Sequence, residues 1–294
     1  MLNSRLISRN IIQSKKIFLL PMPSNFLSTL YPVYLFDLDG TLYLGDRLLP
    51  TVRETVLELM RLGQQLIFLT NDATHPRAHF ARKLSRLGLP VAAEEIINSS
   101  YVMLAYLQQR LPGGRLFVIG EPSLRHELRQ AGFYLCDRPD HVAAVVVSTD
   151  FHFNYRKLKA AFDAIRSGAL FVATNADRTY PLGDGGEEPD TGATIAAIET
   201  CTGHPLDVMV GKPSIYMAQI ALRLAGVSPE HCLLVGDNLE TDIRMGREAG
   251  MRTALVLTGV SHAEHLPASD IQPDYVIRQL ADLLPQGGQD GATR

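Results

Sequence analysis

Val33-Tyr34-Leu35-Phe36-Asp37-Leu38-Asp39-Gly40-Thr41 is the stretch that decides the fold of this chain. A second stretch, Cys232-Leu233-Leu234-Val235-Gly236-Asp237-Asn238-Leu239-Glu240-Thr241-Asp242, follows much later. In both stretches a short apolar run, typical of a buried strand, leads directly into carboxylates. Since the carboxyl ends of parallel strands form the ligand crevice of an open α/β sheet, we expect the two groups of acids to lie close together.

Converging carboxylates require a cation. Asp37, Asp39, Asp237 and Asp242 offer hard oxygen donors. Mg²⁺ prefers such donors, retains some of its waters and commonly bridges to a substrate phosphate. We therefore predict Mg²⁺ as the cofactor.

Two further apolar runs end in polar residues in the same way. Leu66-Ile67-Phe68-Leu69 precedes Thr70-Asn71, and Val208-Met209-Val210 precedes Gly211-Lys212-Pro213. A hydroxyl, an amide and an ammonium group therefore join the acids at the same predicted rim of the sheet.

The four motifs, in this order, resemble those of the haloacid dehalogenase (HAD) superfamily of phosphatases: DxDGT, a Thr or Ser, a Lys, and GDxxxTD. The segments TLYLGD, TND, GKP and GDNLETDI resemble the subclass IIA branch of NagD-like and p-nitrophenylphosphatase proteins, and the similarity spans residues 34–284. The resemblance implies a phosphatase that hydrolyses small phosphomonoesters, such as p-nitrophenyl phosphate, phosphoglycolate, sugar phosphates or nucleotide-like compounds.

Two other classes of protein stay open. One is a catalytically silent HAD-fold binding protein, but such a protein does not need a nucleophile paired with an acid. The other is a different enzyme of the superfamily, such as another phosphotransferase or a dehalogenase. A dehalogenase does not need Asp39 or the metal-binding acids, and a mutase would carry a smaller cap directly after the first motif.

The chemistry of phosphoryl transfer assigns roles to the acids. Asp37 is the candidate nucleophile, because a carboxylate is ionised at neutral pH and can bind the metal with its second oxygen. Asp39 is the candidate acid and base, which protonates the leaving oxygen and later activates water. The resemblance also implies that the backbone carbonyl of Asp39 ligates the metal. Asp237 is the third predicted metal ligand.

The remaining polar residues are predicted to bind phosphate or to support the metal. Thr70 and the Asn71 amide donate to the transferring phosphoryl group, and Lys212 adds positive charge beside them. Asp242 orients either metal-bound water or Lys212. Asn238 ligates the metal or hydrogen-bonds nearby.

Apolar runs alternate with helical stripes along most of the chain, which predicts a Rossmann-like parallel sheet with helices on both faces. We predict a core formed by residues 32–111 and 207–285. An inserted α/β module, residues 112–206, lies between the second and third motifs. By resemblance it is a C2-type cap that closes over the site and selects the substrate.

One loop of the predicted cap carries candidate specificity residues. Ala173-Thr174-Asn175-Ala176-Asp177 ends a predicted strand, and Arg178-Thr179-Tyr180-Pro181-Leu182 follows. The loop resembles the substrate-specificity loop of the branch. Asp177, Arg178 and Tyr180 are therefore candidates for contact with the leaving group.

Composition limits the partners. The net charge is −3 for 294 residues, so no basic face is expected for nucleic acid or a membrane surface. Three cysteines without a CxxC pair argue against a disulfide framework and a zinc site. We expect a cytoplasmic protein that acts on a small phosphorylated metabolite and has the option of pairing as a homodimer through the cap.

The two ends of the chain differ from the rest. Residues 1–31 contain Arg and Lys but no Asp or Glu, and they are predicted to form a disordered extension. Their composition leaves organelle targeting and an upstream start as alternatives. Residues 286–294 are predicted to be a flexible tail.

Overall fold

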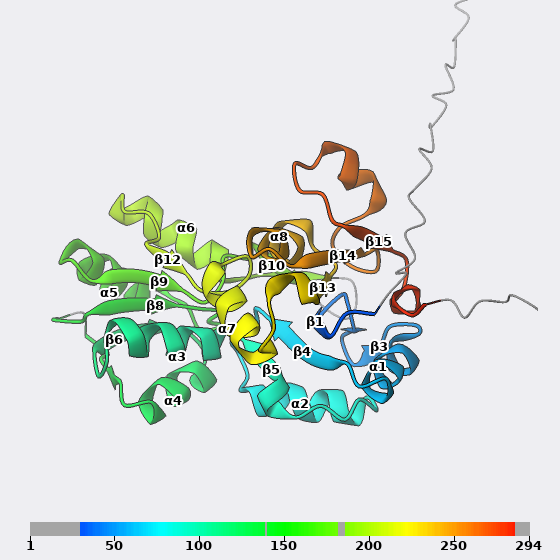
Figure 1. Cartoon of the computed structure of the whole chain (residues 1–294). Coiled ribbons are helices and arrows are strands. Elements are labelled where there is room, and N and C mark those ends of the chain that lie inside the picture. The colour runs from blue at the N-terminus through cyan, green and yellow to red at the C-terminus, as the bar shows by residue number, and fades with distance from the viewer. Residues whose placement is uncertain (1–29, 139, 182–185, 286–294) are drawn as a thin grey trace, which may run out of the picture.

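The computed structural model describes residues 30–138, 140–181 and 186–285 (Figure 1). Most of the predicted N-terminal extension and the whole predicted C-terminal tail lie outside these residues. The described strands form two parallel sheets and two short hairpins. The predicted α/β class is confirmed.

The larger sheet has the strand order β15-β14-β13-β1-β4-β5, and all its pairings are parallel. Its strands are β1 (Val33–Asp37), β4 (Gln65–Thr70), β5 (Ile96–Asn98), β13 (Cys232–Gly236), β14 (Arg252–Val256) and β15 (Tyr275–Ile277). Phe36 aligns with Val235, and Asp37 aligns with Leu69. The carboxyl ends of β1, β4 and β13 therefore meet at one rim.

Helices cover both faces of this sheet, because alternate residues of each strand point to opposite sides. Tyr34 and Phe36 pack in the apolar cluster that contains residues of α1 and α2, whereas Val33 and Leu35 pack in the cluster that contains residues of α3 and α7. The helices are α1 (Val52–Arg61), α2 (Arg77–Arg86), α3 (Ser99–Arg110), α7 (Ile215–Ala225) and α8 (Arg244–Glu248).

The second sheet has the order β12-β9-β8-β6-β7 and is also parallel. Its strands are β6 (Arg115–Ile119), β7 (Tyr134–Leu135), β8 (Ala144–Val147), β9 (Leu170–Ala173) and β12 (Val208–Met209). Helices α4 (Pro122–Gln130), α5 (Tyr155–Arg166) and α6 (Thr191–Thr202) accompany it.

Short elements complete the described chain. The hairpins pair β2 (Tyr43–Leu44) with β3 (Arg47–Leu48), and β10 (Thr179–Pro181) with β11 (Glu187–Pro189). Turns of 3₁₀ helix occur at Ala93–Glu95, Pro229–His231, Ala263–Ala268 and Leu280–Leu283. No helix in the described ranges is both long and apolar enough to cross a membrane.

One apolar cluster spans both sheets. It includes Leu35 and Ile67 from the larger sheet, Leu107 from α3, and Val118 and Val146 from the second sheet. Figure 1 shows α7 between the two sheets. Side chains of α3 and α7 therefore join the two parts of the molecule into a continuous apolar interior.

Two boundaries differ from those predicted. The segment Val208–Met209 was assigned to the core, but as β12 it pairs with β9 in the second sheet. An apolar run predicts a strand but does not say which sheet offers it a free edge. Leu30 and Tyr31 were assigned to the extension, yet both pack against the larger sheet's apolar cluster, and the Tyr31 hydroxyl lies 2.9 Å from that of Tyr275.

Helix α6 was not predicted. Its sequence, TGATIAAIETCT, combines several threonines with a glycine, and these residues are poor helix formers. The helix is held instead by tertiary contacts. Ile195 and Ile198 are buried against the second sheet, and the Asp190 side chain caps the first turn by accepting from the Thr191 N–H at 2.6 Å.

Candidate active site

The carboxyl ends of β1 and β13 bring the two acidic motifs together, as the strand pattern predicts. Asp37 is the last residue of β1, and Asp237 follows β13 directly. Both side chains are buried. Gly40 has a φ of 81°, and a Cβ at this position would collide with the Asp237 carboxylate. The turn after β1 therefore requires glycine for its conformation and for its close approach to Asp237.

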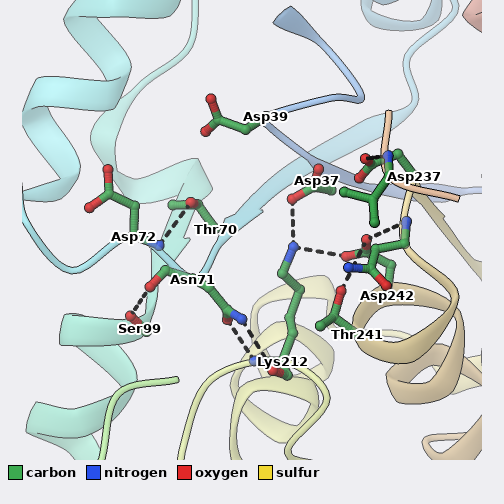
Figure 2. Close-up of polar contacts among 12 residues, drawn as sticks. Asp37, Asp39, Thr70, Asn71, Asp72, Ser99, Lys212, Asp237, Thr241 and Asp242 are labelled. Atoms are coloured by element: carbon green, nitrogen blue, oxygen red, sulfur yellow. Dashed lines mark hydrogen bonds and ion pairs between the residues drawn. The ribbon is translucent and has the colours of Figure 1, made fainter. Parts of the chain in front are cut away.

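Lys212 lies at the centre of the acids. Its Nζ donates to Asp37 Oδ1 at 2.5 Å and to Asp242 Oδ1 at 2.8 Å, and Figure 2 shows the ammonium between these two carboxylates. Burial by itself would lower the pKa of Lys212, but the charges of Asp242 and Asp37 outweigh burial and raise it. Lys212 is therefore a permanently charged group inside the site.

One group of acids within the described ranges can hold a metal ion. Asp37, Asp237 and Asp242 each offer an oxygen atom, and these atoms lie within 4.8 Å of one another. Asp37 Oδ2 is buried without a hydrogen-bond partner in the part of the chain that the structure describes. A hard cation such as Mg²⁺ suits this set of oxygen donors, because it would satisfy an oxygen that otherwise pays the full cost of burial.

The electrostatics of the acids favour a bound cation. Burial raises the pKa of Asp237 well above its ordinary value, and the charges of Asp37 and Asp242 add to the effect. Burial also raises the pKa of Asp242 to about 6, although Lys212 opposes the shift. Lys212 is one cation among three buried carboxylates, so the cluster holds an excess of negative charge.

The Asp39 side chain lies apart from this group and points away from Lys212 (Figure 2). The predicted metal contact through the Asp39 backbone carbonyl stays a prediction, and the Asp39 carboxylate is not one of the three that converge. Its Oδ2 instead accepts a hydrogen bond from the Tyr43 hydroxyl at 3.2 Å. The walls around Asp39 displace bulk water and raise its pKa to about 6, while Lys83 lowers it and Asp37 raises it further. Because the carboxylate remains open to the cavity, water moderates this shift.

Thr70 ends β4 and Asn71 follows it at the same rim, but their side chains have different partners. Thr70 is buried, and its hydroxyl accepts from the Asp72 N–H at 3.1 Å, which leaves the hydroxyl proton free to donate. The Asn71 amide was predicted to bind phosphate. Its Nδ2 instead donates to Asp177 Oδ2 at 2.8 Å and to the Lys212 carbonyl at 3.1 Å, while its Oδ1 accepts from the Lys212 N–H at 2.7 Å. Asn71 therefore links three loops, and its side-chain donors are already occupied.

The turn after β13 positions Asp242. Residues Leu239–Ile243 form a π-helical turn, and Asn238 caps it by accepting from the Glu240 N–H at 2.9 Å. Asp242 Oδ2 accepts from the Asn238 N–H at 3.2 Å. Asp242 therefore contacts Lys212, as one of its two predicted roles requires, and also belongs to the group of three acids.

A cavity of about 420 Å³ opens over these residues and is lined by both parts of the molecule. Of the candidate specificity residues, Asp177 and Tyr180 line it. Burial raises the pKa of Asp177. Arg178 is exposed and is not among the lining residues, so its predicted contact with the leaving group has no support here.

Sequence reasoning missed part of the cavity wall. The lining residues without a predicted role include Tyr43, His75, His79, Lys83, Thr149, Phe151 and Asp190. One signal was available, because His79 and Lys83 are four residues apart, which is the spacing of one helical face. Phe151 had no comparable signal, since it lies in a turn.

Comparison with known proteins places the chain in a family. The model for haloacid dehalogenase-like hydrolases matches residues 34–134, and the HAD-hydrolase-like model matches residues 209–283. The chain belongs to the haloacid dehalogenase-like hydrolase family. The two matched segments contain the motifs of Asp37 and Asp237, respectively.

Relatives of known name agree with this assignment. Chronophin from Rattus norvegicus is 40% identical over 266 residues, which cover 85% of this chain and 86% of chronophin. The p-nitrophenyl phosphatase from Archaeoglobus fulgidus superposes with a TM-score of 0.81 at 33% identity. The match covers 87% of this chain and 98% of the phosphatase chain. NagD from E. coli K-12 superposes with a TM-score of 0.78 at 30% identity, and the match covers 86% of this chain and 98% of the NagD chain. The chain is a phosphatase of the NagD-like branch.

Proposed function

We propose that this phosphatase hydrolyses small phosphomonoesters in two steps, with Asp37 as the nucleophile and Mg²⁺ as the cofactor. The observation that carries the proposal is the unequal environment of the two Asp37 oxygens. Oδ1 accepts from Lys212, whereas Oδ2 is buried without a partner in the described ranges. A buried carboxylate oxygen of this kind is available for a metal or for an incoming phosphorus atom.

In the first step, Asp37 forms a bond to phosphorus while the bond to the leaving oxygen breaks. Asp39 protonates that oxygen as it leaves. The pKa of Asp39, raised to about 6 chiefly by the cavity walls that displace bulk water, suits a group that must give and take a proton near neutral pH. In the second step, Asp39 accepts a proton from water as the water attacks the aspartyl-phosphate, which releases phosphate and restores Asp37.

Lys212 and Thr70 support the transferring group. Lys212 holds Asp37 in place and keeps a positive charge beside the phosphoryl oxygens, while the free Thr70 hydroxyl proton can donate to one of them. Asp37, Asp237 and Asp242 are the side chains that would hold the metal. When bound, Mg²⁺ neutralises the negative charge of the phosphoryl group.

The test is hydrolysis of p-nitrophenyl phosphate with and without Mg²⁺. We expect turnover that is lost on chelation with EDTA and restored by added Mg²⁺. Turnover that persists after complete chelation would contradict a metal-dependent mechanism. Inactivity of well-folded protein in Mg²⁺ towards a panel of phosphomonoesters would favour the catalytically silent binding protein.

Other properties stay predictions. Tyr180 and Asp177 are proposed to contact the leaving group, because both line the cavity. Three further predictions rest on the sequence alone. They are the option of a homodimer through the predicted cap, residues 112–206, a cytoplasmic location, and the lack of nucleic-acid or membrane binding.

A further inference from the structure

One wall of the cavity belongs to α2 and the loop before it. Three residues line this wall: His75 in the loop, and His79 and Lys83, which are four residues apart on one side of α2. The rings of His75 and His79 stack with their centroids 3.9 Å apart. Burial, followed by the charges of His75 and Arg82, lowers the pKa of His79. His79 is therefore neutral near pH 7 and can still donate one N–H.

Lys83 is separated from Asp39 by a single aromatic ring. Its ammonium lies 3.7 Å from the centroid of the Tyr43 ring, and the hydroxyl at the far end of that ring donates to Asp39. Tyr43 therefore links Asp39 to Lys83, and all three residues line the same cavity.

No ion pair to Lys83 occurs among residues 30–138, 140–181 and 186–285. Lys212, the other ammonium that lines the cavity, is held by two carboxylates. No carboxylate in the described part of the chain lies within 4.0 Å of the Lys83 ammonium, whose closest recorded contact is the face of Tyr43. The neighbouring carboxylate of Asp72 is turned to Thr74, from which it accepts two hydrogen bonds. Lys83 is thus a half-buried cation that faces the leaving-group side of the site.

We propose that Lys83, with His79 beside it, binds a second anionic group on the leaving group. The single Tyr43 ring between Lys83 and Asp39 fits a short leaving group that carries a carboxylate. Preferred substrates are therefore phosphate esters of short hydroxy acids, and this selectivity arises from the helix α2 wall. The inference rests on the proposed function, since it takes phosphorus to lie at Asp37 and the leaving oxygen at Asp39.

Two phosphonates that cannot be hydrolysed test the subsite. 3-Phosphonopropionate and propylphosphonate differ only by a carboxylate in place of a methyl group, so the ratio of their dissociation constants isolates that group. We expect calorimetry in Mg²⁺ to give tighter binding of 3-phosphonopropionate. Lys83→Met should reduce this preference about tenfold, as expected for a charge-assisted contact, and Lys83→Arg should retain most of it.

Arg86→Met is the matched control, because Arg86 is an exposed cation on the same helix that does not line the cavity. Its preference should equal that of the wild type. Equal binding of both phosphonates by the wild type would overturn the proposal without the need for any variant. An equal loss for both ligands in Lys83→Met would also overturn it, because Lys83 would then act on the site as a whole. If Lys83→Met does not fold, Lys83→Gln replaces it.

Turnover separates this proposal from the proposed function. The matched esters are 2-phosphoglycolate and ethyl phosphate, and the ratio of their kcat/KM values in each variant cancels any shared effect on Asp39. Protein that prefers 3-phosphonopropionate yet hydrolyses neither ester would refute the proposed function and leave the subsite standing. Protein that hydrolyses both esters, with a ratio unchanged by Lys83→Met, would refute the subsite alone.

Discussion

At the scale of single residues, the two carboxylate oxygens of Asp37 have different environments. One is fixed by the Lys212 ammonium, and the other is buried without a partner in the described ranges. Burial of an unsatisfied carboxylate oxygen costs stability, so its persistence indicates a functional use. The proposed mechanism gives that oxygen a metal or a phosphorus atom as its partner.

Asp37→Asn should abolish hydrolysis of p-nitrophenyl phosphate, by at least roughly 1,000-fold, because an amide is a poor nucleophile. The fold should persist, since Asn has the same size and can still accept from Lys212. Steady-state kinetics measure the loss, and circular dichroism of the same sample checks the fold. Near-normal turnover would remove Asp37 as the nucleophile.

Asp237→Asn should chiefly raise the Mg²⁺ concentration needed for half-maximal activity, by at least about tenfold, because one anionic metal ligand is lost. The measurement is a Mg²⁺ titration of turnover at saturating substrate. Glu240→Gln provides the control, since Glu240 is an exposed acid in the same turn that pairs with Arg244. An unchanged Mg²⁺ requirement in Asp237→Asn would exclude Asp237 as a ligand.

At the scale of elements, contacts between loops fix the positions of the side chains in the site. Asn71 joins the end of β4 to the Lys212 loop and to Asp177 in the loop after β9. Gly211 permits this approach, because a Cβ there would collide with the carbonyl of Thr174 and the side chain of Asn71. A loop from the second sheet thereby touches the residues that hold Lys212.

The junction of β14 and β15 supplies a pH-dependent contribution to stability. Asp274 accepts from the Thr253 N–H and hydroxyl, both at 2.9 Å, and from Arg252 at 2.8 Å. Burial raises the pKa of Asp274, but these hydrogen bonds outweigh burial and lower it below its ordinary value. A lowered pKa means that this stabilisation is present above the ordinary carboxyl pKa and is lost as the pH falls through the folded-state pKa.

Asp274→Asn should therefore lower the free energy of unfolding by about 1–2 kcal/mol at neutral pH. The difference from the wild type should shrink as the pH falls through the folded-state pKa, which lies below the ordinary carboxyl value. Urea unfolding at neutral pH and across this acidic range measures it. A difference that stays constant with pH would show that the charge of Asp274 is not what stabilises this junction.

At the scale of the whole molecule, the two sheets share one apolar interior. Leu107 of α3 is fully buried in the cluster that contains residues of both sheets. A shared interior couples the stability of its parts, since loss of packing in one place exposes the other. The cavity between them is then lined from both sides by elements that stabilise each other.

Leu107→Ala should lower the free energy of unfolding by about 2–5 kcal/mol, as expected for a buried leucine. The whole transition should shift as one, because both sheets rest on the same cluster. Circular dichroism suits the measurement, since the chain has no Trp whose fluorescence could report unfolding. Leu62→Ala, at a residue 38% exposed, should change the stability by less than about 0.5 kcal/mol. Two separate transitions, only one of them shifted, would contradict this coupling.

The sequence alone determined the α/β class and the meeting of Asp37, Asp237, Asp242 and Lys212. Each lies just past a short apolar run or in the turn that follows one, and parallel strands place such residues at one rim. This pattern is local, so it is readable without coordinates.

Only the tertiary structure decided the rest. The pairing of β12 with β9, the use of the Asn71 amide as a link between loops, and the placement of Lys83 over Tyr43 all depend on contacts between segments far apart in the chain. Side-chain type and spacing say what a residue can bind. Which partner it meets is settled by the packing of distant elements, and no local pattern encodes that packing.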